Sequence, residues 1–454
     1  MPDPSKIASS DPSLLVRHAV IVTMNDALDI VEGAVSVRGG RIASVGAEPA
    51  EPHECVIDAR GAYLLPGFVQ THVHLCQTLF RGLADDMPLL DWLRRRVWPL
   101  EAAHTPATLR ASARLAASEL LLTGTTTALT METVHDTDAV FEALEEMGLR
   151  AIVGKCMMDS DGDAPPRLRE QMHASIDESV ALRKRWDGRA NGRLGAAYAP
   201  RFAVSCSRAL LEAVADLSAR ERVLVHTHAS EHREEIEVVR RLSGGMSNLE
   251  YLADTGLATP QLCTAHCVWV NDAEQALLAE RGVKVLHCPS SNLKLGSGIA
   301  PVAEMRARGI SISLGADGAA CNNRLDMFEE MRLAATLQAV RKAPGALRAH
   351  DAVWMATREG ARALGLEHEI GSIERGKRAD FILIERDRPH LAPDADVWST
   401  LVYAARGSDV RTTVVDGQVL VRDFQLTHQD TAEITADARS AARALAERAL
   451  ISGN

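Results

Sequence analysis

The sequence predicts an α/β protein in which a (β/α)8 TIM-like barrel carries a small β-sandwich built from both chain ends. Apolar strand patterns alternate with amphipathic helix patterns about eight times through the middle of the chain, as such a barrel requires. Short strand patterns separated by turn residues occur near both ends, and His or Asp closes several of the central strands. We therefore divide the chain into the N-terminal part of the β-sandwich (1–65), the (β/α)8 barrel (66–370), the C-terminal part of the β-sandwich (371–425) and a helical tail (426–454).

The first part of the chain predicts an antiparallel meander. Alternating Val and Ile residues mark strands within 14–24, 33–47 and 54–67, and Gly39-Gly40 marks a turn. Residues 1–13 contain no apolar run, so we expect no signal peptide.

The middle of the chain predicts the barrel. No phosphate-binding glycine motif follows an early strand, which argues against the alternative of an open, doubly wound nucleotide-binding sheet. Amphipathic helices are predicted at 106–124, 138–149, 207–221 and 271–282. The eight strands are predicted within 68–75, 123–131, 149–157, 192–200, 222–230, 261–269, 283–291 and 311–319.

The last part of the chain, like the first part, contains short strand patterns separated by turn residues. Strand pairs are predicted within 371–387 and 409–423, the second with a hairpin turn at Asp416-Gly417. Two separate small β units are the alternative, but each is too small to bury a face alone, which favours one shared unit. The Ala-rich tail from Thr431 predicts a surface helix.

Composition excludes several classes of function. The chain has 50 Lys+Arg against 61 Asp+Glu and a net charge of −11, which argues against a nucleic-acid partner. Eight dispersed cysteines form no disulfide framework, and Cys263 and Cys267 lack the second pair of a zinc knuckle. No apolar stretch is long enough for a membrane span. We expect a cytoplasmic homo-oligomer that acts on a small molecule.

The chemistry-bearing residues lie at the ends of the predicted strands, where barrel enzymes place their active sites. Alternate strand residues face the same way, so the two His of an H-x-H motif can both point into the barrel mouth. Imidazoles with a carboxylate suit zinc, and iron next. These residues are His72 and His74 on strand one, His226 and His228 followed by Glu231 on strand five, and His266, His287 and Asp317 on strands six, seven and eight.

Several long strings resemble the amidohydrolase superfamily, in its branch of cytosine, guanine and adenosine deaminases. They are LLPGFVQTHVHL, LLLTGTTT, VHTHASE, TAHCV, VLHCPSSNLKLGSGIAP, LGADGAACNNRLDMFEEMR and GSIERGKRADFILIE. The resemblance covers nearly the whole chain and implies the same fold as the pattern of strands and helices. It also implies the metal ligands His72, His74, His228 and Asp317.

The resemblance further implies how the catalytic work is divided. Glu231 matches the family's acid/base carboxylate, which takes a proton from water and returns it to the ring nitrogen. His266 matches a residue beside that water, and Asp317 both binds the metal and accepts a second proton. His226 is expected to support or pack rather than to bind the metal.

One divalent metal per chain is expected, with zinc before iron. Binuclear members of the superfamily bridge two metals with a carboxylated Lys from strand four. Strand four here, within 192–200, has no Lys, and Lys155 lies one strand earlier.

The segment 82–104 resembles the loop after strand one in methylthioadenosine, S-adenosylhomocysteine and 5′-deoxyadenosine deaminases. Glu101 there matches a carboxylate that binds ribose hydroxyls, and Trp92 is either a wall of the pocket or core packing. Guanine deaminases carry a Glu in a similar place, so Glu101 does not distinguish the two groups. The strings SSNLKLGSGIAP and GADGAACNNRLDMFEEMR resemble the adenosine-type group, and the predicted substrate is therefore an adenine nucleoside. The absence of a phosphate loop argues against nucleotides.

One departure keeps a second substrate class open. Where adenosine-type members have a His after the strand-four Pro, this chain has Arg201 and Phe202, and with Gln77 these resemble guanine deaminases. The alternatives are a deaminase of guanine, another oxo-purine or a pterin, and a triazine-type hydrolase. A non-catalytic assembly subunit is a third possibility, but the complete ligand set argues against it.

Overall fold

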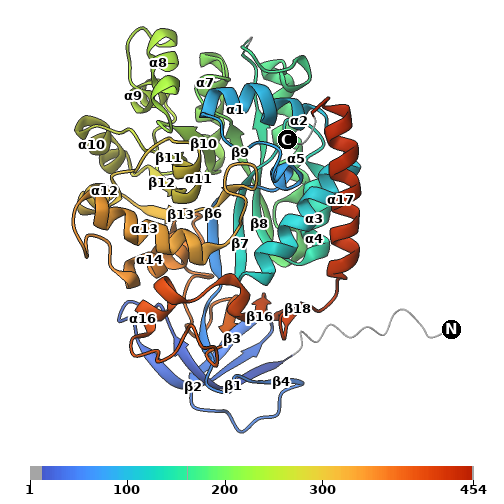
Figure 1. Cartoon of the computed structure of the whole chain (residues 1–454), viewed down its shortest axis with the longest axis vertical. Coiled ribbons are helices and arrows are strands. Elements are labelled where there is room, and N and C mark those ends of the chain that lie inside the picture. The colour runs from blue at the N-terminus through green and yellow to red at the C-terminus, as the bar shows by residue number, and fades with distance from the viewer. Residues whose placement is uncertain (1–12, 161, 452–454) are drawn as a thin grey trace, which may run out of the picture.

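The computed structural model describes residues 13–160 and 162–451 and contains two nine-stranded sheets, one forming the barrel and one lying below it (Figure 1). The expectation about a signal peptide, the first twelve residues of the predicted N-terminal unit and the last three of the tail lie outside the described residues. The predicted fold class is confirmed.

The barrel contains all eight predicted strands in their predicted order. Parallel neighbours run from β6 through to β13, and the ring closes because β14, which continues the eighth strand, pairs with β6. The strands are β6 (Phe68–His74), β7 (Thr125–Met131), β8 (Arg150–Met157), β9 (Leu194–Pro200), β10 (Val225–Ala229), β11 (Leu262–His266), β12 (Lys284–His287), β13 (Ile312–Leu314) and β14 (Asp317–Gly318).

The eighth strand is predicted as one segment, but the structure divides it into β13 and β14. Gly315 lies directly against β6 at the break, where a Cβ atom would be 2.6 Å from the carbonyl oxygen of His72. Asp317 then takes a left-handed backbone conformation with φ of 62°. The close approach needs glycine, and the turn that follows aims the Asp317 carboxylate into the barrel mouth.

Helices surround the barrel, and the four that the sequence predicts are confirmed as α3, α4, α7 and α10. In α3, for example, the residues that favour the start of a helix are in place, since Thr105 caps its N-terminus and Pro106 occupies its first turn. The helices around the barrel are α3 (Pro106–Leu122), α4 (Asp138–Met147), α5 (Met172–Trp186), α6 (Arg189–Gly192), α7 (Arg208–Glu221), α8 (Arg233–Leu242), α9 (Asn248–Asp254), α10 (Asp272–Arg281), α11 (Pro289–Lys294), α12 (Val302–Ala307), α13 (Met327–Arg341), α14 (Ala349–Ala356) and α15 (Arg358–Ala363).

Short helical turns follow the first strand and cover the barrel mouth. The 3-10 helix η2 (Leu75–Phe80) leads through a loop into α1 (Leu89–Trp92), the π-helix η3 (Leu93–Val97) and α2 (Trp98–Ala102). The other short turns are η4 (Pro166–Leu168), α16 (Val397–Ser399), η5 (Thr400–Ala404) and η6 (Gly407–Asp409).

The second sheet joins both ends of the chain, as predicted. Strand β5 pairs antiparallel with β15, from Phe381 opposite Pro66 to Ile384 opposite Tyr63, which makes one continuous hydrogen-bonded sheet from the two halves. Its strands are β1 (Leu14–Val22), β2 (Ile30–Arg38), β3 (Arg41–Gly46), β4 (Cys55–Asp58), β5 (Tyr63–Pro66), β15 (Phe381–Ile384), β16 (Val410–Val415), β17 (Gln418–Arg422) and β18 (Gln425–Leu426).

The Asp416-Gly417 hairpin turn is confirmed between β16 and β17. Both residues have positive φ, 52° and 77°, as the mirror-image turn of a tight hairpin requires. Barrel and sheet are joined by a buried ion pair, in which Arg150 of β8 donates to Asp380 at 2.7 and 3.1 Å.

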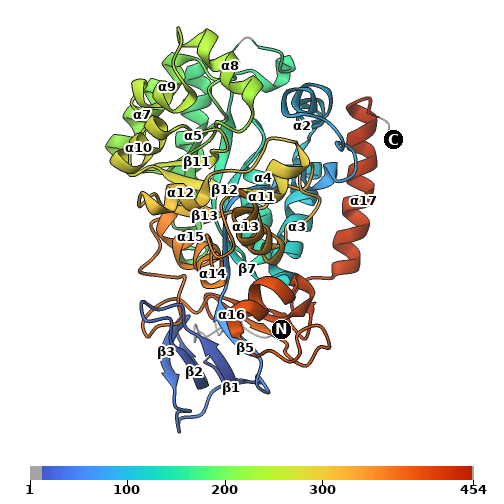
Figure 2. The same cartoon turned by 60° about the vertical axis from the view of Figure 1, so that its left-hand side comes forward.

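The predicted tail helix is α17 (Thr431–Arg448), which lies along α3 on the side of the barrel (Figures 1 and 2). Ile434 and Leu445 are buried in that contact. We propose that the four-unit division of the chain stands: β5 runs to Pro66 and β18 to Leu426, one residue past the predicted boundaries, while β6 begins at Phe68 and α17 at Thr431. Within the described ranges, no helix has the length and apolarity needed to cross a membrane.

Candidate metal centre and its pocket

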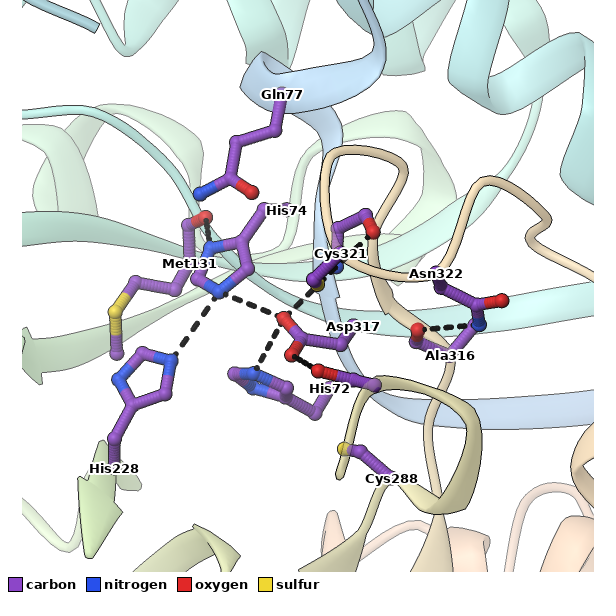
Figure 3. Close-up of polar contacts among 12 residues, drawn as sticks. His72, His74, Gln77, Met131, His228, Cys288, Ala316, Asp317, Cys321 and Asn322 are labelled. Carbon is purple, nitrogen blue, oxygen red and sulfur yellow. Dashed lines mark hydrogen bonds and ion pairs between the residues drawn. The ribbon is translucent and has the colours of Figure 1, made fainter. Parts of the chain in front are cut away.

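Four predicted ligands meet at the carboxyl ends of β6, β10 and β14. One nitrogen or oxygen atom from each of His72, His74, His228 and Asp317 lies within 4.8 Å of the corresponding atom in every other member. Nε2 of His74 lies 3.2 Å from Nε2 of His228, and Oδ1 of Asp317 lies 3.3 Å from His72 and 3.2 Å from His74. Figure 3 shows these groups pointing toward one another.

Each imidazole is fixed by a partner on its outer nitrogen. Nδ1 of His74 donates to the carbonyl of Met131 at 2.7 Å, and Nδ1 of His228 donates to the carbonyl of Arg201 at 2.7 Å. Nδ1 of His72 lies 2.7 Å from Nε2 of His226, whose other nitrogen faces a backbone carbonyl. With the outer nitrogens protonated, the inner Nε2 lone pairs converge, which is the arrangement of histidines that bind a metal.

The pKa shifts of two of the three histidines agree with this arrangement. Burial lowers the pKa of His72 to about 4 and, with neighbouring imidazoles, lowers the pKa of His228 well below its usual value. Burial also acts to lower the pKa of His74, but Asp317 outweighs it and the pKa is raised. The centre therefore combines two imidazoles that favour the neutral form with a carboxylate that favours a positive charge beside it.

These residues fit a divalent metal. Zinc binds imidazole nitrogen and carboxylate oxygen at about 2.0–2.2 Å, which places neighbouring ligand atoms about 3.3 Å apart in a tetrahedron. The separations of 3.2 and 3.3 Å match that value. The Nε2 atoms of His74 and His228 face each other, so a cation between them could be bound by both.

Asp317 is held by more than its histidines. The Ser291 hydroxyl donates to Oδ2 of Asp317 at 2.6 Å from the start of α11. Burial acts to raise the pKa of Asp317, but the contacts with His72 and His74 outweigh burial and hold the pKa well below its usual value. Asp317 is therefore ionised and suited to bind a cation.

Glu231 and His266 lie beside the four ligands. Nε2 of His266 is 3.4 Å from Oε2 of Glu231 and 3.8 Å from Oδ2 of Asp317, and its Nδ1 contacts Asn292 at 2.9 Å. Burial, with the charges of Asp317 and Glu235 adding to it, raises the pKa of Glu231 well above its usual value. A buried carboxyl with a raised pKa, next to a metal centre, is suited to carry a proton.

Backbone conformation is unusual at the same strand ends. Ser230, His266 and Asp317 all have positive φ, 54°, 74° and 62°, which side chains other than glycine seldom adopt. Such residues cluster at functional sites because the surrounding structure must hold them there.

A pocket opens from the metal centre and contains most of the predicted substrate residues. Trp92 is both pocket wall and core, since it is buried in an apolar cluster with Leu79, Phe80 and Val97. The residues that line the pocket are His74, Gln77, Leu89, Trp92, Leu93, Arg201, Phe202, His228, Glu231, His266, Leu295 and Asp317.

Glu101 is in a different place from the other predicted substrate residues. It lies behind the pocket wall, where it accepts two hydrogen bonds from Arg201 at 2.6 and 3.1 Å and one from Gln77 at 3.0 Å. Glu101 and Arg201 are both buried, so the ion pair is shielded from water. Oε1 of Gln77 is buried and has no hydrogen-bond partner among the described residues.

Two residues discussed from sequence stay outside the centre. His287 ends β12 and is buried, but it is not one of the four grouped ligands, and its ring nitrogens lack partners within residues 13–160 and 162–451. Lys155 points away from the metal group, donating to Glu170 at 2.5 Å and Ser175 at 3.3 Å.

Sequence reasoning missed the residues that support the centre. Ser291 and Asn292 hold Asp317 and His266, and Glu330 of α13 accepts from Ser290 at 2.5 Å and from Asn322 at 2.9 Å. All lie within the strings that carry the family resemblance, but nothing in the spacing of these residues indicates which side chain they contact.

Comparison with known proteins gives a consistent result. Residues 63–420 match the amidohydrolase family. The chain is 42% identical to a 5′-deoxyadenosine deaminase of Methanothermobacter thermautotrophicus, over 90% of this chain and 95% of that protein. It is 41% identical to a 5-methylthioadenosine/S-adenosylhomocysteine deaminase of Symbiobacterium thermophilum, over 95% and 99%. A zinc-bound adenosine deaminase of Xanthomonas campestris superposes with a TM-score of 0.88 at 33% identity, covering 96% of this chain and 98% of that one.

Proposed function

The chain belongs to the amidohydrolase family and is a hydrolase of C–N bonds, and within that class we propose that it deaminates an adenine nucleoside. The substrates proposed are 5′-deoxyadenosine, methylthioadenosine, S-adenosylhomocysteine and adenosine, each converted to its inosine analogue and ammonia. The observation that carries the proposal is Glu231 beside the His72, His74, His228 and Asp317 group, at the base of a pocket. Relatives named as nucleoside deaminases, similar over nearly the whole chain, support the choice of substrate.

The residues divide the reaction between them. A divalent metal, when bound, supplies a Lewis acid that makes water nucleophilic at neutral pH. Glu231 accepts a proton from that water and delivers it to the ring nitrogen next to the carbon that bears the amine. His266, whose Nδ1 donates to the side-chain carbonyl of Asn292, points its Nε2 toward Glu231 and Asp317, beside the place of the attacking water. Asp317, kept ionised by its contacts, accepts the proton that remains on the attacking oxygen and passes it to the exocyclic amine, which then leaves as ammonia.

We propose a single zinc ion as the resident metal. Three imidazoles and one carboxylate form one set of ligands, and strand β9 has no Lys to bridge a second ion. The chemistry of the donors suits zinc, with iron as the alternative. A homo-oligomeric state and a cytoplasmic location remain predictions from sequence.

A second candidate is a deaminase of guanine or another oxo-purine. Arg201 and Gln77 both face the pocket, so unused guanidinium N–H groups and the free Oε1 of Gln77 offer donors and an acceptor side by side. A lactam edge, with a carbonyl next to an N–H, complements that pair. The nucleoside remains the first choice because of the relatives.

One assay panel separates the two candidates. Purified enzyme loaded with zinc is given 5′-deoxyadenosine, methylthioadenosine, adenosine, guanine and a chlorotriazine, and ammonia or chloride release is measured for each. We expect kcat/KM to be highest for one of the adenine nucleosides. Rapid guanine turnover with inert nucleosides would replace the first candidate by the second, and chloride release alone would identify a triazine hydrolase.

A further inference from the structure

Lys294, the last residue of α11, connects three loops at the mouth of the barrel. Its Nζ donates to the carboxylate of Asp85 and to the side-chain carbonyl of Asn323, and lies 3.5 Å from the carbonyl of Ala320. Asp85 belongs to the loop after β6, Lys294 follows β12, and Ala320 and Asn323 follow β14. One ammonium group with three donors thus spans the loops after the first, seventh and eighth strands.

The loop that contains Asp85 leads directly into the cover of the pocket. Leu89, Trp92 and Leu93 follow within eight residues and line the pocket opposite the metal centre. Leu295, next to Lys294, lines it as well and packs in the same apolar cluster as those three residues. Figure 1 shows α1 over the carboxyl end of the barrel, far from the sheet formed by the chain ends. We name residues 81–97 the cover segment.

The cover segment has few other polar connections to the barrel frame. Besides Lys294–Asp85, the described ion pairs of its side chains are Arg81–Glu119 at its start and Arg94–Asp163 at its end. The Lys294–Asp85 pair is about one-third exposed on each side, whereas the Arg94–Asp163 side chains are 43% and 63% exposed. A half-shielded pair is screened less by water than a surface pair, so it can fix a loop more firmly.

From this geometry we infer that Lys294 is a positioning residue, whose ion pair with Asp85 holds the cover segment closed over the substrate pocket. Leu89, Trp92 and Leu93 of this segment form an apolar wall of the pocket, so the strength of the pair determines how well that wall is ordered before the substrate binds. Lys294 does not line the pocket and needs no contact with the reacting atoms. The inference extends the proposed function to a residue outside the catalytic group, and its effect on KM rests on that function.

Loss of the pair should loosen the cover and leave the metal centre intact. Lys294→Met keeps the length of the side chain and removes its charge. We expect KM to rise roughly three- to thirty-fold while kcat stays within about threefold, because a loosened wall weakens binding more than chemistry. Metal content should not change, since the four ligands keep their own partners.

Amide hydrogen exchange tests the same inference without a substrate. In the zinc-loaded enzyme, peptides that cover residues 81–97 should exchange faster in Lys294→Met and in Asp85→Asn than in wild type. The amides of Leu83 and Trp92, which donate to the carbonyls of Phe80 and Pro88, should be among those affected. Exchange in the barrel strands should stay unchanged, which confirms that the variants are folded.

Two further variants complete the design. Arg94→Met removes the more exposed pair of the same segment and should behave as wild type in both measurements. The double exchange Lys294→Asp with Asp85→Lys restores an ion pair with reversed polarity and should recover at least part of the lost protection. Unchanged exchange and unchanged KM in both Lys294→Met and Asp85→Asn would overturn the inference. If nucleosides are inert and another substrate is turned over, the proposed function fails, while the exchange result still decides the role of Lys294.

Discussion

The two ends of the pocket are built in different ways. At the proposed metal end, the four candidate ligands come from the ends of strands, and a hydrogen-bond partner outside the group fixes each of them. At the substrate end, Gln77, Glu101 and Arg201 hold one another, and the apolar cover is tied to the barrel by ion pairs between loops. The frame of the barrel thus determines the metal end, whereas pairings between separate loops determine the substrate end. The metal end accordingly indicates the class of reaction. The substrate end leaves two candidate classes of substrate, adenine nucleosides and oxo-purines.

Removing a metal ligand should have the largest effect. We expect His228→Ala to lose both metal and turnover, because the three remaining protein ligands bind the ion too weakly. Without the metal, water is not activated, and activity should fall by about 10⁴-fold or more. Elemental analysis and an ammonia assay measure the two losses together. His173→Ala, at an exposed position of α5, is the control and should match wild type. Full metal content in His228→Ala would show that the centre is not the one described.

Glu231→Gln should separate chemistry from metal binding. The amide keeps the size of the side chain but cannot carry a proton, so kcat should fall by about 10²–10⁴ while the metal remains. Glu234→Gln, on the exposed side of the same region, controls for loss of charge. If Glu231→Gln retained most of its kcat, the proton would have to be carried by Asp317 instead.

The stability of the protein should fall when one charge of the buried Arg201–Glu101 pair is removed, and it should largely recover when both charges are removed. Arg201→Met leaves the Glu101 carboxylate buried without its cation, and we expect the free energy of unfolding to fall by about 3–5 kcal/mol. The double variant Arg201→Met with Glu101→Leu should recover much of that loss, as denaturant unfolding can measure. Equal stability of Arg201→Met and wild type would mean that the pair is not shielded as the structure shows.

The double variant Arg201→Met with Glu101→Leu also tests which class of substrate Arg201 binds. If Arg201 binds an oxo-purine, guanine turnover should disappear almost completely, because a site built to hydrogen-bond a group loses most when that bond is unmade. Turnover of 5′-deoxyadenosine should fall less, and the ratio of the two kcat/KM values is the quantity to compare.

Loss of the hydrogen bond that supports Asp317 should have the smallest effect of all. Ser291→Ala removes the donor at 2.6 Å from Asp317, and we expect metal affinity to fall about 10- to 100-fold, as is usual when a ligand loses its outer partner. Competition with a chelator measures the affinity, and saturating zinc should restore most of the activity. No change in affinity would show that the histidines alone orient Asp317.

Much of the fold follows from local patterns in the chain. The eight barrel strands, four of the surrounding helices, the Asp416-Gly417 turn and the α17 helix are confirmed, because each depends on periodicity or turn chemistry over a few residues. The division of the eighth strand at Gly315 could not be predicted, since it depends on how closely that residue approaches His72.

The sequence by itself determined the metal end of this protein. His72 and His74 share a strand face because side chains alternate, and the parallel order of a barrel brings the ends of β6, β10 and β14 to one rim. Only the tertiary structure decided the substrate end. Arg201 meets Glu101 across 100 residues of chain and Lys294 meets Asp85 across 209, and such contacts leave no periodic signal in either segment. Their pairing depends on where the loops pack, which is fixed only when the whole barrel has closed.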